Sequence, residues 1–193
     1  MTTENHIIAG ITGSLGHRRQ LALLLDSGGT GHITDIDPAT LGEAGIRALA
    51  LDFDGVLSPH GASEPLPEVI AWLKHCCGTI GSGRVFILSN KPTPFRNEWF
   101  RCNFPGIRFI SGTRKKPFPD GLNIIGKLSG VPLPAILMVD DRLLTGCLAA
   151  LNAGARPCYI RQPYVLFSGR PLAELFFILL RSCERLFVRL INR

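Results

Sequence analysis

Short apolar runs alternate with helix-like segments along most of the chain. Five runs of four or five residues have the length and apolar content of buried strands; they cover residues 47–51, 85–88, 107–110, 135–139 and 157–160. Between them, apolar residues at helical spacing or capping residues predict helices over 66–77, 119–128 and 143–153. This alternation predicts an α/β fold in which a central parallel sheet is flanked by helices.

The two ends of the chain differ from this central pattern. Residues 1–31 are rich in glycine, and because their glycines match no nucleotide-binding loop, we expect a flexible or membrane-contacting segment. Asp37 followed by Pro38 marks a helix start. Residues 172–192 predict a long amphipathic helix. We therefore divide the chain into an N-terminal segment (1–31), a core (32–165) and a basic amphipathic C-terminal helix (166–193).

Composition excludes several classes of protein. The chain has 193 residues, of which 46% are hydrophobic and 19% are charged, so it is long and apolar enough to fold as one domain. The apolar run at 175–180 is far shorter than the roughly 20 residues that span a bilayer. No basic stretch precedes the first apolar residues, as a secretory signal would require. The six cysteines show no metal-type pair, so we expect reduced thiols in a cytoplasmic protein.

The positive charge gathers at the C-terminus. The formal net charge is +6, and residues 161–193 alone hold six arginines against two glutamates. Nucleic acid and anionic lipid are both possible partners for such a tail. Arg181, Arg185 and Arg189 follow one stripe of the predicted helix beside leucines and phenylalanines. Two alternatives remain open: the helix lies on an anionic lipid surface, or it docks on the sheet with its arginines in water.

Polar side chains follow three of the predicted strands. The first strand is followed by Asp52 and Asp54, the second by Ser89 and Asn90, and the fourth by Asp140 and Asp141. In an open parallel sheet the carboxyl ends of the strands meet at one edge, where ligands bind. Lys115 and Lys116 lie in the loop before the helix predicted at 119. We therefore expect these residues to share one crevice.

The spacing and type of these residues limit the chemistry that they can perform. Asp52 and Asp54 are two residues apart and point to the same side of an extended segment. Close carboxylates repel unless a cation lies between them, and hard oxygen ligands suit Mg²⁺. A cation there would neutralise a phosphate so that a carboxylate can attack it. Lys116 and Ser89 would then hold the transferring oxygens.

In the order and spacing of these motifs, residues 33–165 resemble the haloacid dehalogenase superfamily of aspartyl-phosphate phosphatases. The resemblance implies a Rossmann-like fold in which Asp52 is the nucleophile and Asp54 is the general acid and base. It also implies that Ser89 binds the phosphoryl group and that Lys116 stabilises its charge.

The same resemblance implies the metal site. Asp141 would ligate Mg²⁺ together with Asp52 and the carbonyl of Asp54, supported by Asp140. Many phosphatases of the superfamily carry an inserted cap domain. Here 35 residues separate Asp54 from Ser89, and 27 separate Ser89 from Lys116, which leaves no room for one. We therefore expect a capless enzyme with a crevice open to bulky substrates.

The stretches at 32–52, 115–121 and 139–145 are similar to those of the capless phosphatidylglycerophosphate phosphatases. This similarity implies a phosphorylated lipid headgroup as substrate and a peripheral position at the inner face of a membrane. Asn90, Lys91 and Lys115 are expected to bind substrate. The chain departs from that family, which usually has Gly where Asp140 stands and an acid where Gly146 stands; Asp140 is the candidate to replace that acid.

Two alternatives to a lipid phosphatase remain. One is a capless phosphatase that acts on phosphoproteins or nucleic-acid ends. The other is a catalytically silent lipid-binding or scaffold protein. We expect an anionic phospholipid surface as the partner and no nucleic acid, and the sequence does not indicate an oligomeric state.

Overall fold

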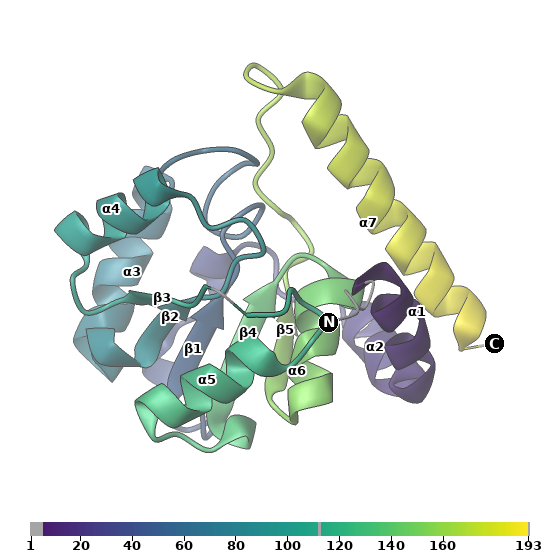
Figure 1. Ribbon diagram of the computed structural model, residues 1–193, viewed down its shortest axis with the longest axis horizontal. Coiled ribbons are helices and arrows are strands. Elements are labelled where there is room, and N and C mark those ends of the chain that lie inside the picture. The colour runs from purple at the N-terminus through teal and green to yellow at the C-terminus, as the bar shows by residue number, and fades with distance from the viewer. Residues whose placement is uncertain (1–5, 112, 193) are drawn as a thin grey trace.

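In a computed structural model of the chain, residues 6–111 and 113–192 are described. Residues 1–5 of the predicted N-terminal segment and residue 193 of the predicted tail lie outside them. Five parallel strands form one sheet in the order β3-β2-β1-β4-β5 (Figure 1). The strands are β1 (Ala48–Leu51), β2 (Val85–Ile87), β3 (Arg108–Phe109), β4 (Ile136–Asp140) and β5 (Arg156–Tyr159). Each overlaps one of the five apolar runs, so the predicted α/β fold is confirmed.

Helices cover both faces of this sheet because its strands are apolar on both sides. Leu49 and Leu51 of β1 pack into a core with α3 (Pro67–Ile80) and α4 (Pro94–Asn103). Ala48 and Ala50 face the opposite side, where α5 (Asp120–Ser129) and α6 (Leu148–Ala153) pack. The alternation along β1 thus sends large side chains to one layer and small ones to the other.

Most of the described part of the N-terminal segment is helical, where the sequence predicted a flexible or membrane-contacting segment and no helix. It forms α1 (His6–Gly16) and α2 (Arg18–Asp26), and Leu21 is fully buried in a third apolar cluster beside β5. The glycines misled the sequence analysis because they mark a packing surface. A Cβ at Gly10 would contact the carbonyl oxygen of Leu144, and one at Gly13 would contact Leu148. Both would be ordinary van der Waals contacts, so this side of α1 packs against its neighbours.

Other predicted helices differ in detail. The start at Asp37 is real, since its carboxylate accepts a hydrogen bond from the amide of Ala39, but only a single 3₁₀ turn follows (Pro38–Thr40). The helix predicted over 143–153 is divided into a π-helical turn (Leu143–Cys147) and α6, which ends at Gly154 as predicted. Further 3₁₀ turns occupy Ile33–Asp35, Ser82–Arg84 and Leu133–Ala135.

The C-terminal helix is present as α7 (Pro171–Ile191) and lies beyond the β5 side of the sheet, next to α2 (Figure 1). No described helix is long and apolar enough to cross a membrane. Between β1 and β2 the chain forms a loop, α3 and a 3₁₀ turn, and between β2 and Lys116 the described residues form α4 and β3. Neither stretch contains an additional domain. The six cysteines are free thiols.

Candidate active site

The predicted site residues meet at the carboxyl edge of the sheet. A cavity of about 480 Å³ opens there, lined by Asp52 after β1, Ser89 after β2 and Asp141 after β4. The other predicted residues that line it are Asp54, Asn90, Lys91, Lys115 and Lys116. Asp140 does not line the cavity, and its side chain is fully buried. The topology therefore gathers the predicted motifs at one edge.

Three carboxylates form an acidic cluster, which we define as Asp52, Asp140 and Asp141. One oxygen from each lies within 4.8 Å of the others. Burial, together with the charges of neighbouring carboxylates, raises the pKa of Asp52 to about 7. Burial likewise raises the pKa of Asp141 to about 6 and also raises the pKa of Asp140. Hard oxygen donors this close, in a site that disfavours their negative charge, fit a divalent cation such as Mg²⁺.

The carboxylate of Asp54 is not part of this cluster. Arg96 holds it with two hydrogen bonds, Nη2 to Oδ1 at 2.7 Å and Nη1 to Oδ2 at 3.0 Å. Although burial raises the pKa of Asp54, the hydrogen bonds and charge of Arg96 outweigh it and lower the pKa. The carboxylate of Asp54 thus faces Arg96 rather than the acidic cluster, and its carbonyl remains the predicted metal ligand.

Arg96 was missed by the sequence analysis because it belongs to no motif. It lies in the first turn of α4, where its amide donates to the N-cap Thr93. Its guanidinium stacks over the Phe53 ring at 3.9 Å and donates to the carbonyl of Ala62. These contacts bury the side chain and fix it beside Asp54.

Lys116 contacts two members of the acidic cluster, Asp52 and Asp140. Its Nζ lies 3.0 Å from Oδ1 of Asp52 and 2.5 Å from Oδ2 of Asp140, and the residue is only 3% exposed. Burial opposes its charge, but Asp140 and Asp52 raise the pKa of Lys116, so it is an ammonium ion. The side chain of Asn90 positions it, since Oδ1 accepts a hydrogen bond from the Lys116 amide at 2.9 Å. The side chain of Asn90 therefore bonds to the backbone of Lys116.

Asp140 and Gly146 are complementary in shape. A Cβ at position 146 would overlap the carboxylate of Asp140. That carboxylate also accepts a hydrogen bond from the amide of Arg142 at 2.8 Å. Asp140 thus fills the space that any side chain at 146 would need, and glycine is required there.

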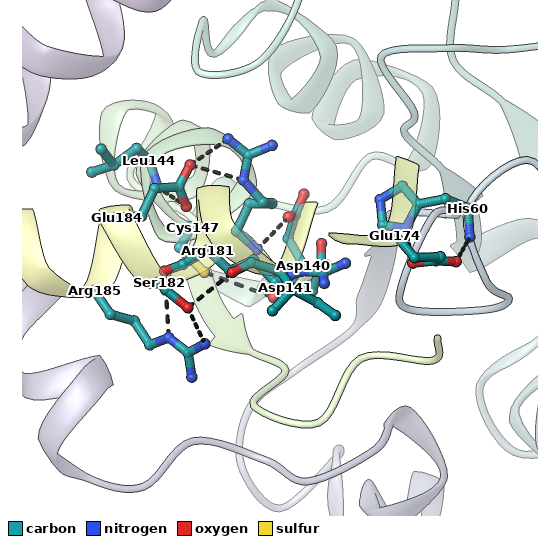
Figure 2. Close-up of polar contacts among 12 residues, drawn as sticks. His60, Asp140, Asp141, Leu144, Cys147, Glu174, Arg181, Ser182, Glu184 and Arg185 are labelled. Atoms are coloured by element: carbon teal, nitrogen blue, oxygen red, sulfur yellow. Dashed lines mark hydrogen bonds and ion pairs between the residues drawn. The ribbon is translucent and has the colours of Figure 1, made fainter. Parts of the chain in front are cut away.

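The cation stripe predicted on the C-terminal helix is divided between two environments. Arg181 is buried, and its Nε donates to Oδ2 of Asp141 at 2.6 Å (Figure 2). Its Nη1 and Nη2 atoms have no hydrogen-bond partner among the described residues. Arg185 is half-buried and Arg189 is exposed. The two alternatives for this helix placed Arg181 on lipid or in water, and both are wrong for this residue. The spacing of apolar residues along a helix does not reveal an ion pair with a distant part of the chain.

Two further residues of α7 contact the same edge. Glu184 accepts a hydrogen bond from Nε of Arg142 at 2.8 Å, and Glu174 accepts one from the amide of His60 at 3.1 Å (Figure 2). His60 lines the cavity, although its sequence context gave no reason to place it there. α7 also supplies Phe177 to the cavity wall. The crevice is therefore covered on one side by the C-terminal helix.

The mouth of the cavity is basic. Ser89 is buried, and its Oγ accepts a hydrogen bond from the amide of Lys91. Lys91, Lys115 and Arg170 line the cavity with exposed side chains. Nζ of Lys91 lies 5.7 Å from the centre of the Phe177 ring. None of these three cations pairs with a carboxylate of the described residues, so they are available to an anionic ligand.

Comparisons with known proteins add little beyond the fold. No family and no curated protein matches the chain. A solved structure of an uncharacterized protein from Corynebacterium glutamicum is 20% identical, with a TM-score of 0.47, and the match covers 69% of this chain and 93% of that one. CbbY from Rhodobacter sphaeroides in complex with phosphate is 16% identical, with a TM-score of 0.39 and coverage of 64% and 91%. Likenesses this distant carry no argument about activity.

Proposed function

We propose that this chain is a Mg²⁺-dependent phosphomonoester hydrolase that acts through an aspartyl-phosphate on Asp52. The observation that supports it most is the acidic cluster, which lies in contact with Lys116 at the edge of a cavity that Ser89 also lines. Asp52, Asp140 and Asp141 would hold Mg²⁺, which supplies positive charge to the phosphoryl oxygens.

In the first half-reaction, an oxygen of Asp52 attacks phosphorus and the bond from phosphorus to the ester oxygen breaks. Lys116 stabilises the charge that Asp52 and the phosphoryl group share, and Ser89 donates to a phosphoryl oxygen. The departing oxygen needs a proton, which the resemblance assigns to Asp54. Because Arg96 favours the ionised form of Asp54, this proposal requires substrate binding to loosen that ion pair.

In the second half-reaction, water attacks the phosphorus of the aspartyl-phosphate. Asp54, as a carboxylate, takes a proton from this water, and the bond from phosphorus to the Asp52 oxygen breaks. Inorganic phosphate leaves and Asp52 is restored. The lowered pKa of Asp54 is suited to this step because the base must be ionised at neutral pH.

For the substrate, we propose phosphatidylglycerophosphate, which the enzyme would convert to phosphatidylglycerol. Its headgroup carries a terminal phosphomonoester and a second, internal phosphate. Lys91, Lys115 and Arg170, which pair with no carboxylate of the described residues, line the mouth of the cavity and suit a headgroup with two anionic phosphates. The described residues between the motifs form no inserted domain that would exclude a lipid.

Phosphate release from three substrates tests this proposal. They are vesicles that contain phosphatidylglycerophosphate, a phosphoserine peptide and a 5′-phosphorylated oligonucleotide, each with Mg²⁺ or EDTA. We expect Mg²⁺-dependent release from the vesicles, its loss in Asp52→Asn, and normal release in Glu43→Gln, an exposed control. Faster release from peptide or oligonucleotide would overturn the lipid assignment. No release from any of them or from an aryl phosphate would favour a silent scaffold.

A further inference from the structure

The exposed large hydrophobic side chains gather on the terminal helices. α7 exposes six of them: Leu172, Leu175, Phe176, Leu179, Leu186 and Leu190. α1 adds Ile8, Ile11 and Leu15, and α2 adds Leu23. The three helices lie together beyond β5 (Figure 1). We call the outer sides of these helices the terminal surface.

The orientation of α7 is opposite to that of an ordinary surface helix. Such a helix buries its apolar stripe and shows its charges to water. α7 instead buries Glu174, Arg181 and Glu184 against the site and exposes leucines, of which Leu172 is 82% exposed and Leu179 is 57% exposed. The ion pairs of these buried residues fix which side of the helix faces inward. The outward apolar stripe is therefore a consequence of the fold and needs another partner.

The charges on the terminal surface indicate what that partner is. Arg18 and Arg19 are exposed on α2, and Arg189 is exposed on α7. The acidic residues of α7 are both buried, which leaves Asp26 as the exposed acid of the described parts of these three helices. Apolar side chains flanked by arginines are complementary to an anionic bilayer, because the former enter its interface and the latter pair with its headgroups.

We propose that the terminal surface docks on an anionic lipid bilayer with α7 still bound to the active site. This rests on the proposed function and names its partner. The same helix that contacts lipid supplies Phe177 to the cavity wall and places Arg181 on Asp141. Lipid contact and the catalytic edge are thus on two sides of one helix.

Flotation with vesicles tests this inference. The probes are vesicles of phosphatidylcholine alone or with phosphatidylglycerol, and the protein carries Asp52→Asn so that turnover plays no part. We expect flotation with the anionic vesicles only. Leu179→Glu and Leu186→Glu should each weaken it at least about tenfold, because burial of one leucine is worth at least that factor. Ile124→Glu, on the exposed side of α5, is the matched control and should float normally.

Three results would overturn the inference. They are no flotation, equal flotation with neutral vesicles, and unchanged flotation of both leucine variants. A dimer in sedimentation without lipid that Leu179→Glu converts to monomers would identify a second copy as the occupant, and would also overturn it. Normal far-ultraviolet circular dichroism of the variants shows that they are folded. If flotation behaves as expected while the wild-type protein hydrolyses no phosphate ester, only the proposed function fails.

Discussion

Lys116 carries a buried positive charge in the candidate active site. Its ammonium group is buried between the carboxylates of Asp52 and Asp140. Lys116→Met keeps the length of the side chain and removes the charge. The variant leaves two buried carboxylates without their shared counter-ion, in an acidic cluster where burial already raises the pKa of each member.

The magnitude follows from the geometry. At an effective dielectric constant of about 20, two unit charges 3.0 Å apart attract by roughly 5 kcal/mol. The desolvation of the groups offsets much of this attraction, and removal of one partner from a buried pair typically costs about 3–5 kcal/mol. We therefore expect Lys116→Met to lower the free energy of unfolding by about 3–5 kcal/mol. That is a large part of the roughly 5–15 kcal/mol that stabilises a domain.

Urea unfolding in EDTA, followed by circular dichroism near neutral pH, measures this change. Lys115→Met removes the exposed neighbouring charge and should stay within about 0.5 kcal/mol of wild type. Adding Asp140→Asn to Lys116→Met should restore part of the loss, because one stranded carboxylate is gone. If the single variant does not fold, the double variant is compared with Asp140→Asn alone. A loss below about 1 kcal/mol for Lys116→Met would mean that the two carboxylates do not need the Lys116 charge.

Three further predictions concern the same edge. Gly146→Ala should lower the free energy of urea unfolding by about 1–3 kcal/mol because the new methyl group overlaps Asp140. The control is Gly78→Ala on α3, where the methyl group has open space, and it should raise the free energy of unfolding by up to about 1 kcal/mol. Arg181→Met should tighten Mg²⁺ binding in calorimetry at least about fivefold, since a like charge within a few ångströms costs roughly 1 kcal/mol even in water; weaker binding would contradict this. In EDTA the free energy of unfolding should rise as the pH falls from about 8 to about 5, because the folded acidic cluster binds protons that the unfolded chain releases. Mg²⁺ should abolish that rise. A free energy of unfolding that falls over the whole range would contradict the raised pKa values.

The sheet and its catalytic edge could be predicted from the sequence because both follow from local pattern. Continuous apolar runs mark β1 and β4, and the polar residues directly after them must lie at the carboxyl edge of a parallel sheet. Asp52, Ser89 and Asp141 therefore line one cavity, as expected.

What escaped prediction depends on contacts between distant residues. Arg96 meets Asp54 across 42 positions, and Arg181 meets Asp141 across 40. No periodicity indicates which side of a helix will form such a pair. The glycines of α1 were equally ambiguous, because glycine is common in flexible segments and yet these glycines lie in a helix.

The proposed mechanism requires Asp52 to accept a phosphoryl group. Acid quenching during turnover of a phosphomonoester with Mg²⁺, followed by proteolysis and mass spectrometry, tests it most directly. We expect one phosphoryl group on the peptide that contains Asp52, located on that side chain and absent in EDTA. A phosphoryl group on Asp54 or Ser89 instead, or steady turnover by Asp52→Asn, would contradict it.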